Sequence, residues 1–131
     1  MRKTVVLALV LNTLLFSSNS MANVVRHQLA ESIEQREPIG DYAANVMVEA
    51  GELKKVFFFT QITDLANTQI THRWFYQGQE KALVTLNIGS DNWRTYSSKM
   101  IPSYWSGAWQ VQVWQEDKLL LSSDFTVVQE P

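Results

Sequence analysis

Histidine, arginine and aromatic side chains gather in one short stretch, ITHRWFYQGQ, at residues 70–79. A histidine can act as a general base when a nucleophile lies about 3 Å away and a third group orients the ring. Hydroxyl groups for such a pair are offered by Ser97 and Ser98 in the later segment WRTYSSK. A reaction centre built from His72 with Ser97 or Ser98 is therefore the chemistry to be weighed first.

The motifs around these residues do not favour catalysis. His72 is accompanied by no G-x-S-x-G motif, and the triplet SSK that ends at Lys99 lacks the S-x-x-K spacing of serine–lysine hydrolases. The chain has no cysteine, which removes thiol nucleophiles, redox pairs and cysteine-based metal sites. The other histidine, His27, stands in no H-x-x-x-H relation to His72, as a zinc site would favour. We expect no catalytic residue, no metal and no cofactor.

The same residue types suit a binding face, because arginine forks and wet aromatic rings are common in ligand contacts. Arg73 can meet a carboxylate, a phosphate or a partner residue. The alternative for it is a surface ion pair of little energetic value. A second polar and aromatic concentration, residues 89–109, holds the remaining candidates, although Trp93 could equally plug the end of a folded sheet. The candidate ligand-binding residues are Arg73, Trp93, Arg94, Ser98, Lys99 and Trp105.

Other polar residues are expected to have structural roles. Side chains alternate between the two faces of a strand, so His72 and Trp74 share one face while Arg73 lies on the other. Trp74 is predicted to be a core residue with a bonded indole N–H, and His72 a histidine at the edge of the core. Arg36 joins this structural set. A further alternative is that Arg36, Arg73 and Arg94 all pin the N-terminal segment to the sheet through backbone carbonyls.

The elements that would position these residues are β-strands from residue 53 onward. Period-two patterns rich in β-branched and aromatic residues predict strands at residues 53–63, 69–77, 81–89, 93–100, 108–115 and 119–128. Four aspartates, Asp64, Asp91, Asp117 and Asp124, are expected in turns or at strand edges, most of them as turn formers. Residues 25–33 fit a helix and a strand equally well. With one N-terminal strand, the pattern predicts an all-β fold, a single antiparallel β-sandwich of immunoglobulin-like type with about seven strands.

The N-terminus indicates export. Arg2 and Lys3 precede an apolar run at residues 4–16 and then small residues before Asn23, which is the order of a secretory signal peptide; an uncleaved anchor is the alternative. We expect a signal peptide at residues 1–22, one β-sandwich domain at residues 23–131, and a periplasmic or secreted location. The domain would keep nine basic and thirteen acidic residues. A net charge of −4 with no basic run argues against nucleic acid as a partner.

Five segments, taken in order, resemble a known family. They are REPIGDY, KVFFFTQITDL, THRWFYQGQ, LNIGSDNWRTYSSK and WSGAWQVQVW, within about Val25–Val128. In these the chain resembles the bacterial domain of unknown function 2914 family. The resemblance implies a small β-rich envelope-associated domain with no assigned activity, substrate or cofactor. It implies a strand at residues 25–33. It also implies a shared polar–aromatic set at 36–38, 71–74, Trp93-Arg94 and 97–99.

Two hypotheses about function follow. The first is a non-catalytic envelope module that binds a protein or a glycan through a strand face or loop rim. The second is an envelope hydrolase or transferase that uses His72 with Ser97 or Ser98. The first agrees better with an acidic, cysteine-free sandwich that carries no recognisable catalytic motif, so we expect the protein not to be an enzyme.

Overall fold

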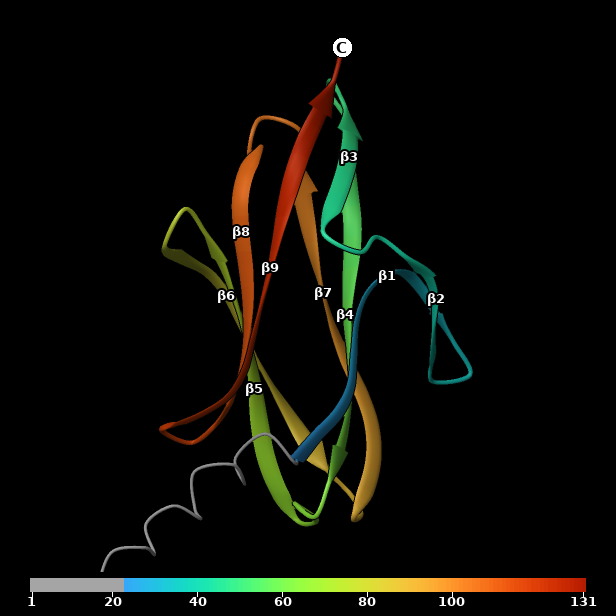
Figure 1. The fold of residues 1–131 in the computed structure, drawn as a ribbon, viewed down its shortest axis with the longest axis vertical. Coiled ribbons are helices and arrows are strands. Elements are labelled where there is room, and N and C mark those ends of the chain that lie inside the picture. The colour runs from blue at the N-terminus through green and yellow to red at the C-terminus, as the bar shows by residue number, and fades with distance from the viewer. Residues whose placement is uncertain (1–22) are drawn as a thin grey trace, which may run out of the picture.

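The computed structural model describes residues 23–131, and the predicted signal peptide at 1–22 lies outside the described residues. The described chain forms nine strands in two sheets that pack face to face (Figure 1). The four-stranded sheet has the order β2 (Glu37–Asp41), β1 (Val24–Glu34), β4 (Leu53–Thr63) and β7 (Asn92–Pro102). The five-stranded sheet has the order β3 (Asn45–Glu49), β9 (Lys118–Glu130), β8 (Gly107–Gln115), β5 (Thr68–Tyr76) and β6 (Gln79–Ile88).

The prediction of an all-β sandwich is confirmed, and residues 25–33 lie in strand β1. Two details were wrong. The described residues hold nine strands where about seven were expected, because β2 and β3 lie in a stretch interrupted by Pro38 and Gly40. The sandwich is also not wholly antiparallel, since β3 pairs in parallel with β9, from Asn45 opposite Thr126 to Glu49 opposite Glu130. The described part of the chain contains no helix long and apolar enough to cross a membrane.

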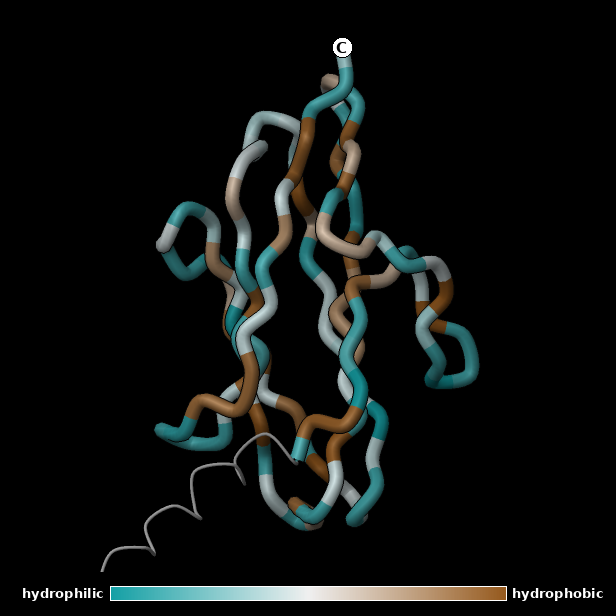
Figure 2. The backbone as a smooth tube through the Cα atoms, viewed as in Figure 1, coloured by the Kyte–Doolittle hydropathy of each residue, from teal (hydrophilic) through white to brown (hydrophobic). Residues whose placement is uncertain are grey.

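The core lies between the sheets and follows from strict alternation along the strands. Figure 2 shows apolar and polar residues succeeding one another along the tube. On β5, Ile70, His72 and Trp74 are fully buried, while the residues between them keep partial exposure. Trp74 meets Phe58 of β4 and Phe125 of β9 edge to face, with ring centroids 6.5 Å and 6.3 Å apart. One indole therefore touches both sheets, as a core anchor should.

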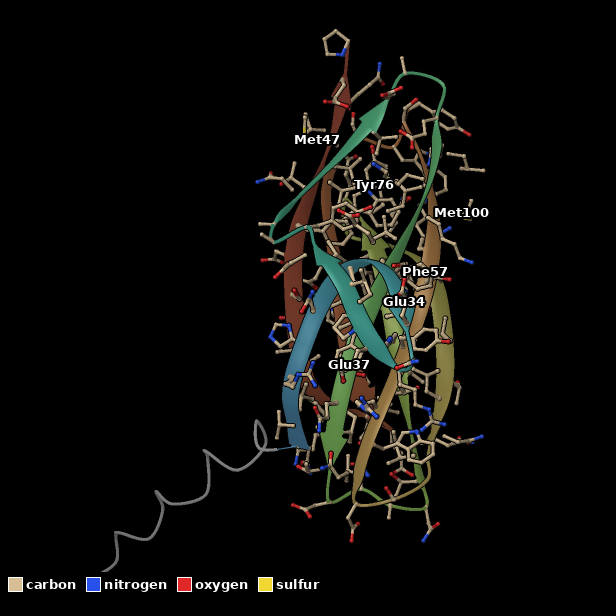
Figure 3. The ribbon with its side chains drawn as sticks, turned by 90° about the vertical axis from the view of Figure 1, so that its right-hand side faces the viewer. Glu34, Glu37, Met47, Phe57, Tyr76 and Met100 are labelled. Atoms are coloured by element: carbon tan, nitrogen blue, oxygen red, sulfur yellow. The ribbon has the colours of Figure 1, made fainter. Side chains whose placement is uncertain are left out.

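Part of the outer face of the four-stranded sheet is covered by its own hairpin. The first part of β1, up to Ala30, pairs with β4, whereas residues 32–34 pair only with β2. The β1–β2 hairpin thus leaves the plane of the sheet and crosses in front of β4, as Figure 3 shows around the labelled Glu37 and Glu34. Phe59 points to this outer face and is nevertheless fully buried, with Arg26 stacked 4.9 Å from its ring centre. β4 is therefore buried on both faces.

Candidate functional site

The structure distributes the six candidate ligand-binding residues over three places. Arg73 lies on the outer face of the five-stranded sheet, and Arg94 and Ser98 lie on the outer face of the four-stranded sheet. The others, Trp93, Lys99 and Trp105, pack toward the space between the sheets. Trp93 lies at the start of β7 and Trp105 follows its end. At the rise of an extended strand, the two are about 30 Å apart. The six residues do not form one site.

Arg94 and Trp93 hold the β1–β2 hairpin in place. The carboxylate of Glu37 in the hairpin accepts one hydrogen bond from Arg94 Nη1 at 2.5 Å and one from Arg26 Nη2 at 2.8 Å. These two hydrogen bonds lower the pKa of Glu37 to about 2. Arg36 stacks 4.8 Å from the ring centre of Trp93. The arginines thus attach the N-terminal segment through a carboxylate and an indole, whereas the sequence suggested backbone carbonyls.

Trp105 closes one end of the sandwich inside an aromatic and cationic cluster. Its ring stacks on Tyr76 at 5.8 Å and 17°, and Trp109 donates its indole N–H to the Trp105 carbonyl at 2.9 Å. The ammonium groups of Lys81 and Lys99 lie 4.8 Å and 5.5 Å from the Trp105 ring centre. Lys81 is the extra residue of a β-bulge in edge strand β6, which turns its side chain inward. These contacts fix the ring of Trp105.

His72 belongs to a buried polar network that joins the two sheets. Its Nδ1 lies 2.7 Å from Ser97 Oγ, and its Nε2 lies 3.1 Å from Thr60 Oγ1. Trp74 Nε1 donates to Ser97 Oγ at 3.1 Å, and Thr60 Oγ1 donates to the Thr95 carbonyl at 3.2 Å. Strand β5 supplies the two rings, while the hydroxyls come from β4 and β7 of the opposite sheet.

The donors and acceptors of this network fix its protons. Because Thr60 gives its only proton to a carbonyl, it must accept from His72 Nε2–H. His72 Nδ1 is then an acceptor and receives the hydroxyl proton of Ser97, which in turn accepts from Trp74. Every member is satisfied when the imidazole is neutral. Burial lowers the pKa of His72 to about 3, which agrees with the neutral form.

The His72–Ser97 contact has the length that a base–nucleophile pair requires, yet its surroundings favour a structural role. His72 is fully buried and Ser97 is 5% exposed, so a substrate has no approach to the hydroxyl. Ser98, the other proposed nucleophile, points away from His72 on the outer face of the sheet. Within residues 23–131, no group of three or more histidine or carboxylate side chains is arranged to hold a metal ion.

The outer face of the five-stranded sheet carries an ordered polar surface. Arg73 stacks 5.2 Å from the ring centre of Trp114, and its contact with Glu80 Oε1 is long, at 3.9 Å. Arg73 Nε is buried and has no hydrogen-bond partner among the described residues. This arginine is therefore held by packing more than by an ion pair, and about a third of its side chain, 34%, is exposed.

A directional chain of side-chain hydrogen bonds runs along β8, the strand that pairs with Arg73 of β5. Trp114 Nε1 donates to Gln112 Oε1 at 2.7 Å, Gln112 Nε2 donates to Gln110 Oε1 at 2.6 Å, and Gln110 Nε2 donates to Asp124 Oδ1 at 2.6 Å. An indole can only donate and a carboxylate only accept, so the two ends fix the orientation of both amides. Asp124 lies within β9 opposite Gln110, inside the strand predicted at residues 119–128 and not in a turn. We call Trp114, Gln112, Gln110 and Asp124 the amide ladder.

A groove of about 610 Å³ opens beside the amide ladder. Its lining joins β5, β8 and β9 with the segment before β3 and contains Ala44, Asn45, Phe75, Gln77, Gly78, Ala108, Gln110, Gln112, Asp124 and Thr126. Of the candidate binding residues, Arg73 alone is next to it, directly opposite Gln112. Alternation with the buried Val111 and Val113 is enough to place Gln110 and Gln112 on an outer face, but the bond from Gln110 to Asp124 depends on the long-range register of β8 on β9.

Comparison with known protein families gives a match in the C-terminal half of the chain. Residues 67–127 match the family described as "Protein of unknown function (DUF2914)". This is the family that the sequence resembles, and the resemblance is confirmed over these residues. The DUF2914 match runs from the start of β5 into β9 and is shorter than the stretch over which the sequence resembled the family. It includes all residues of the amide ladder. No curated protein matches the chain.

Solved structures share the architecture at low sequence identity. An immunoglobulin-like protein from Pseudomonas aeruginosa superposes with a TM-score of 0.56 at 17% identity, over 78% of this chain and 91% of that one. The CARDB domain of a Pyrococcus furiosus protein, in complex with di-metal ions, gives 0.49 at 12% identity, over 82% and 96%. The first likeness establishes the immunoglobulin-like fold and nothing about activity.

Proposed function

We propose that this protein is a non-catalytic binding module of the bacterial cell envelope, and that it binds through the outer face of the five-stranded sheet. The observation that carries the proposal is the contrast between the two outer faces. The β1–β2 hairpin lies over part of the four-stranded sheet, where Phe59 is fully buried, while Tyr96 and Met100 of β7 are exposed on the rest of that face. The other face keeps Arg73, Phe75 and Trp114 partly exposed and carries the groove.

The chemistry of this face supports binding. Arginine and tryptophan are enriched among the residues that dominate interface energies, and both occur here in mutual contact. The amide ladder holds Trp114, which holds Arg73, so few rotors remain to be ordered when a ligand arrives. The buried, neutral His72 supports the non-enzymatic part of the proposal.

An envelope location is supported by the residues that precede the domain. Their basic start, short apolar run and small residues are typical of a signal peptide. Cell fractionation of the full chain would test this part, with the protein expected in the periplasm or the medium and shortened by about 22 residues. A full-length protein that stays in the cytoplasm would contradict it.

The binding face is tested by capture experiments with matched variants. The double variant Arg73→Ala/Trp114→Ala should lose at least about tenfold of the envelope protein or glycan that the immobilised wild-type domain retains, since hot-spot truncations commonly cost more than about 1.4 kcal/mol. The control Tyr96→Ala/Met100→Ala removes two exposed side chains from the opposite outer face and should bind as the wild type does. Equal capture by wild type and Arg73→Ala/Trp114→Ala would refute the proposed face.

A further inference from the structure

We infer that the groove beside the amide ladder is a binding site for an uncharged oligosaccharide. The inference rests on the proposed function and specifies its ligand. Three features carry it, namely a hollow floor of small residues, a row of amides with unused hydrogen-bonding capacity, and a lining almost without charge.

The groove exists because small residues occupy this part of the outer face of the sheet, while larger side chains surround it. Ala108 on β8 lies between Thr126 of β9 and Gln77, whose backbone N–H donates to the Ala108 carbonyl at 2.9 Å. Ala44 and Gly78 complete the small residues of the lining. The segment before β3 is held at the rim, where Thr126 N donates to the Ala44 carbonyl at 2.8 Å. The depression is thus built into the paired backbone.

The amide ladder leaves a defined set of donors and acceptors for a ligand. Gln110 and Gln112 each use one N–H and one lone pair of the side-chain amide within the ladder. Each therefore retains one N–H donor and one acceptor lone pair. Sugar hydroxyls both donate and accept, so a pyranose ring can satisfy an amide of fixed orientation on both counts. Because the ladder is already ordered, little entropy is lost on binding.

The remaining lining residues favour a neutral ligand with an apolar ring face. Asp124 is the one ionisable side chain that lines the groove among the described residues, and Gln110 already binds it. Phe75 lies opposite Gln110 and can pack against the C–H face of a sugar, while Asn45 and Gln77 add two amides at the rim. The exposed Leu83 and Leu119, which would suit a protein partner, do not line the groove.

The test is nuclear magnetic resonance of the ¹⁵N-labelled domain, which reports the side-chain amides directly. Cellohexaose, maltohexaose and the N-acetylglucosamine hexamer are the probes, titrated to millimolar concentration. At least one should shift the side-chain N–H signals of Gln110 and Gln112. Ala108→Trp should fill the floor and weaken this binding by about tenfold or more, a loss of about 1.4 kcal/mol. Thr85→Trp adds the same ring on exposed edge strand β6 outside the groove and should bind as the wild type does.

Backbone signal dispersion shows that each variant is folded before binding is compared. If none of the three hexasaccharides shifts the Gln110 and Gln112 signals, or if Ala108→Trp binds them undiminished, the oligosaccharide site is refuted. If the sugars fail but capture of an envelope protein still depends on Arg73 and Trp114, the face binds protein and the proposed function stands. If capture is also independent of these residues, both proposals fail.

Discussion

At the scale of single residues, the hydrogen-bond inventory decides what His72 does. The histidine touches a serine at 2.7 Å, but Ser97 also accepts from Trp74, and Thr60 passes its proton to a backbone carbonyl. A protonated imidazole would donate from both nitrogens and leave the Ser97 hydroxyl proton without its acceptor. The network therefore stabilises one protonation state and one arrangement of the two sheets.

Removing the Ser97 hydroxyl should destabilise the fold strongly. Ser97→Ala leaves the Trp74 indole N–H and the His72 Nδ1 without partners in a buried site, at about 1–3 kcal/mol for each group. We expect a loss of about 2–5 kcal/mol in the free energy of unfolding, measured by urea denaturation. The neighbouring Ser98→Ala is the control and should change stability by less than about 0.5 kcal/mol. Equal effects of the two substitutions would contradict the network.

Stability should fall as the pH is lowered from 7 to 5, because His72 is neutral in the folded state. Burial lowers its folded pKa to about 3 from an ordinary value of 6.5, so the unfolded chain binds the proton first. The contribution is complete above pH 6.5 and is lost as the pH falls toward 3. Between pH 7 and 5 the expected loss is about 2 kcal/mol in urea denaturation.

The state of the ring can be read independently of stability. The carbon-bound proton signals of His72 should not titrate between pH 7 and 5 in the folded domain, since its pKa of about 3 lies below that range. A midpoint near pH 6 for His72 would show that the imidazole charges inside the sandwich and would remove the basis of the predicted acid instability.

Strand alternation predicts faces but not partners. It correctly put Trp74 in the core, with Arg73 on the opposite side, because side-chain direction along a strand is a local property. It could not reveal the bond between Gln110 and Asp124, which are brought together by the register of β8 on β9. The groove depends on the same register, so it too is absent from any local pattern.

At the scale of elements, the β1–β2 hairpin joins the rest of its sheet only through the first part of β1, because β2 pairs with β1 alone among the described strands. Arg26, Gln61 and Arg94 lie in one row across β1, β4 and β7, and Glu37 contacts both arginines of this row. The side chains are well exposed, so each ion pair contributes little alone. The attachment comes from several contacts that act together, including the stacking of Arg36 on Trp93.

Glu37→Gln should loosen this hairpin without unfolding the sandwich. The substitution removes the charge that Arg26 and Arg94 share, so amide hydrogen exchange should rise in β2 and in the second half of β1. Core strands β4 and β5 should exchange as in the wild type. Glu34→Gln changes an exposed carboxylate of the same hairpin and serves as the control. Unchanged exchange in β2 of Glu37→Gln would show that the ion pairs do not hold the hairpin.

The two strands that sequence analysis missed share a physical cause. β2 and β3 are five residues long, and β2 contains Pro38 and Gly40, which are typical strand breakers. β3 gains its order from parallel pairing with β9, about 80 residues further along the chain. The longer strands were predictable because most carry their own alternation, as in β5 and β8.

At the scale of the whole molecule, the family match and the folded unit differ in extent. Residues 67–127 include most of the five-stranded sheet and, of the four-stranded sheet, only β7. The residues before 67 supply β1, β2 and β4 of the four-stranded sheet and β3 of the five-stranded sheet. Of the sixteen buried residues in the core cluster, six come from before residue 67: Leu29, Val46, Val48, Val56, Phe58 and Ile62.

We therefore expect residues 67–131 alone not to fold, whereas residues 23–131 should unfold cooperatively. Each buried aliphatic or aromatic side chain contributes about 1.5–3 kcal/mol, so losing six removes about 9–18 kcal/mol. A domain of this size is stable by about 5–15 kcal/mol. The shorter chain would also expose Trp74 and leave His72 without Thr60. Near-ultraviolet circular dichroism and urea denaturation of both chains provide the measurement. A cooperative transition in residues 67–131 would show that the five-stranded sheet is stable without its partner, and that the two layers are not a single cooperative unit.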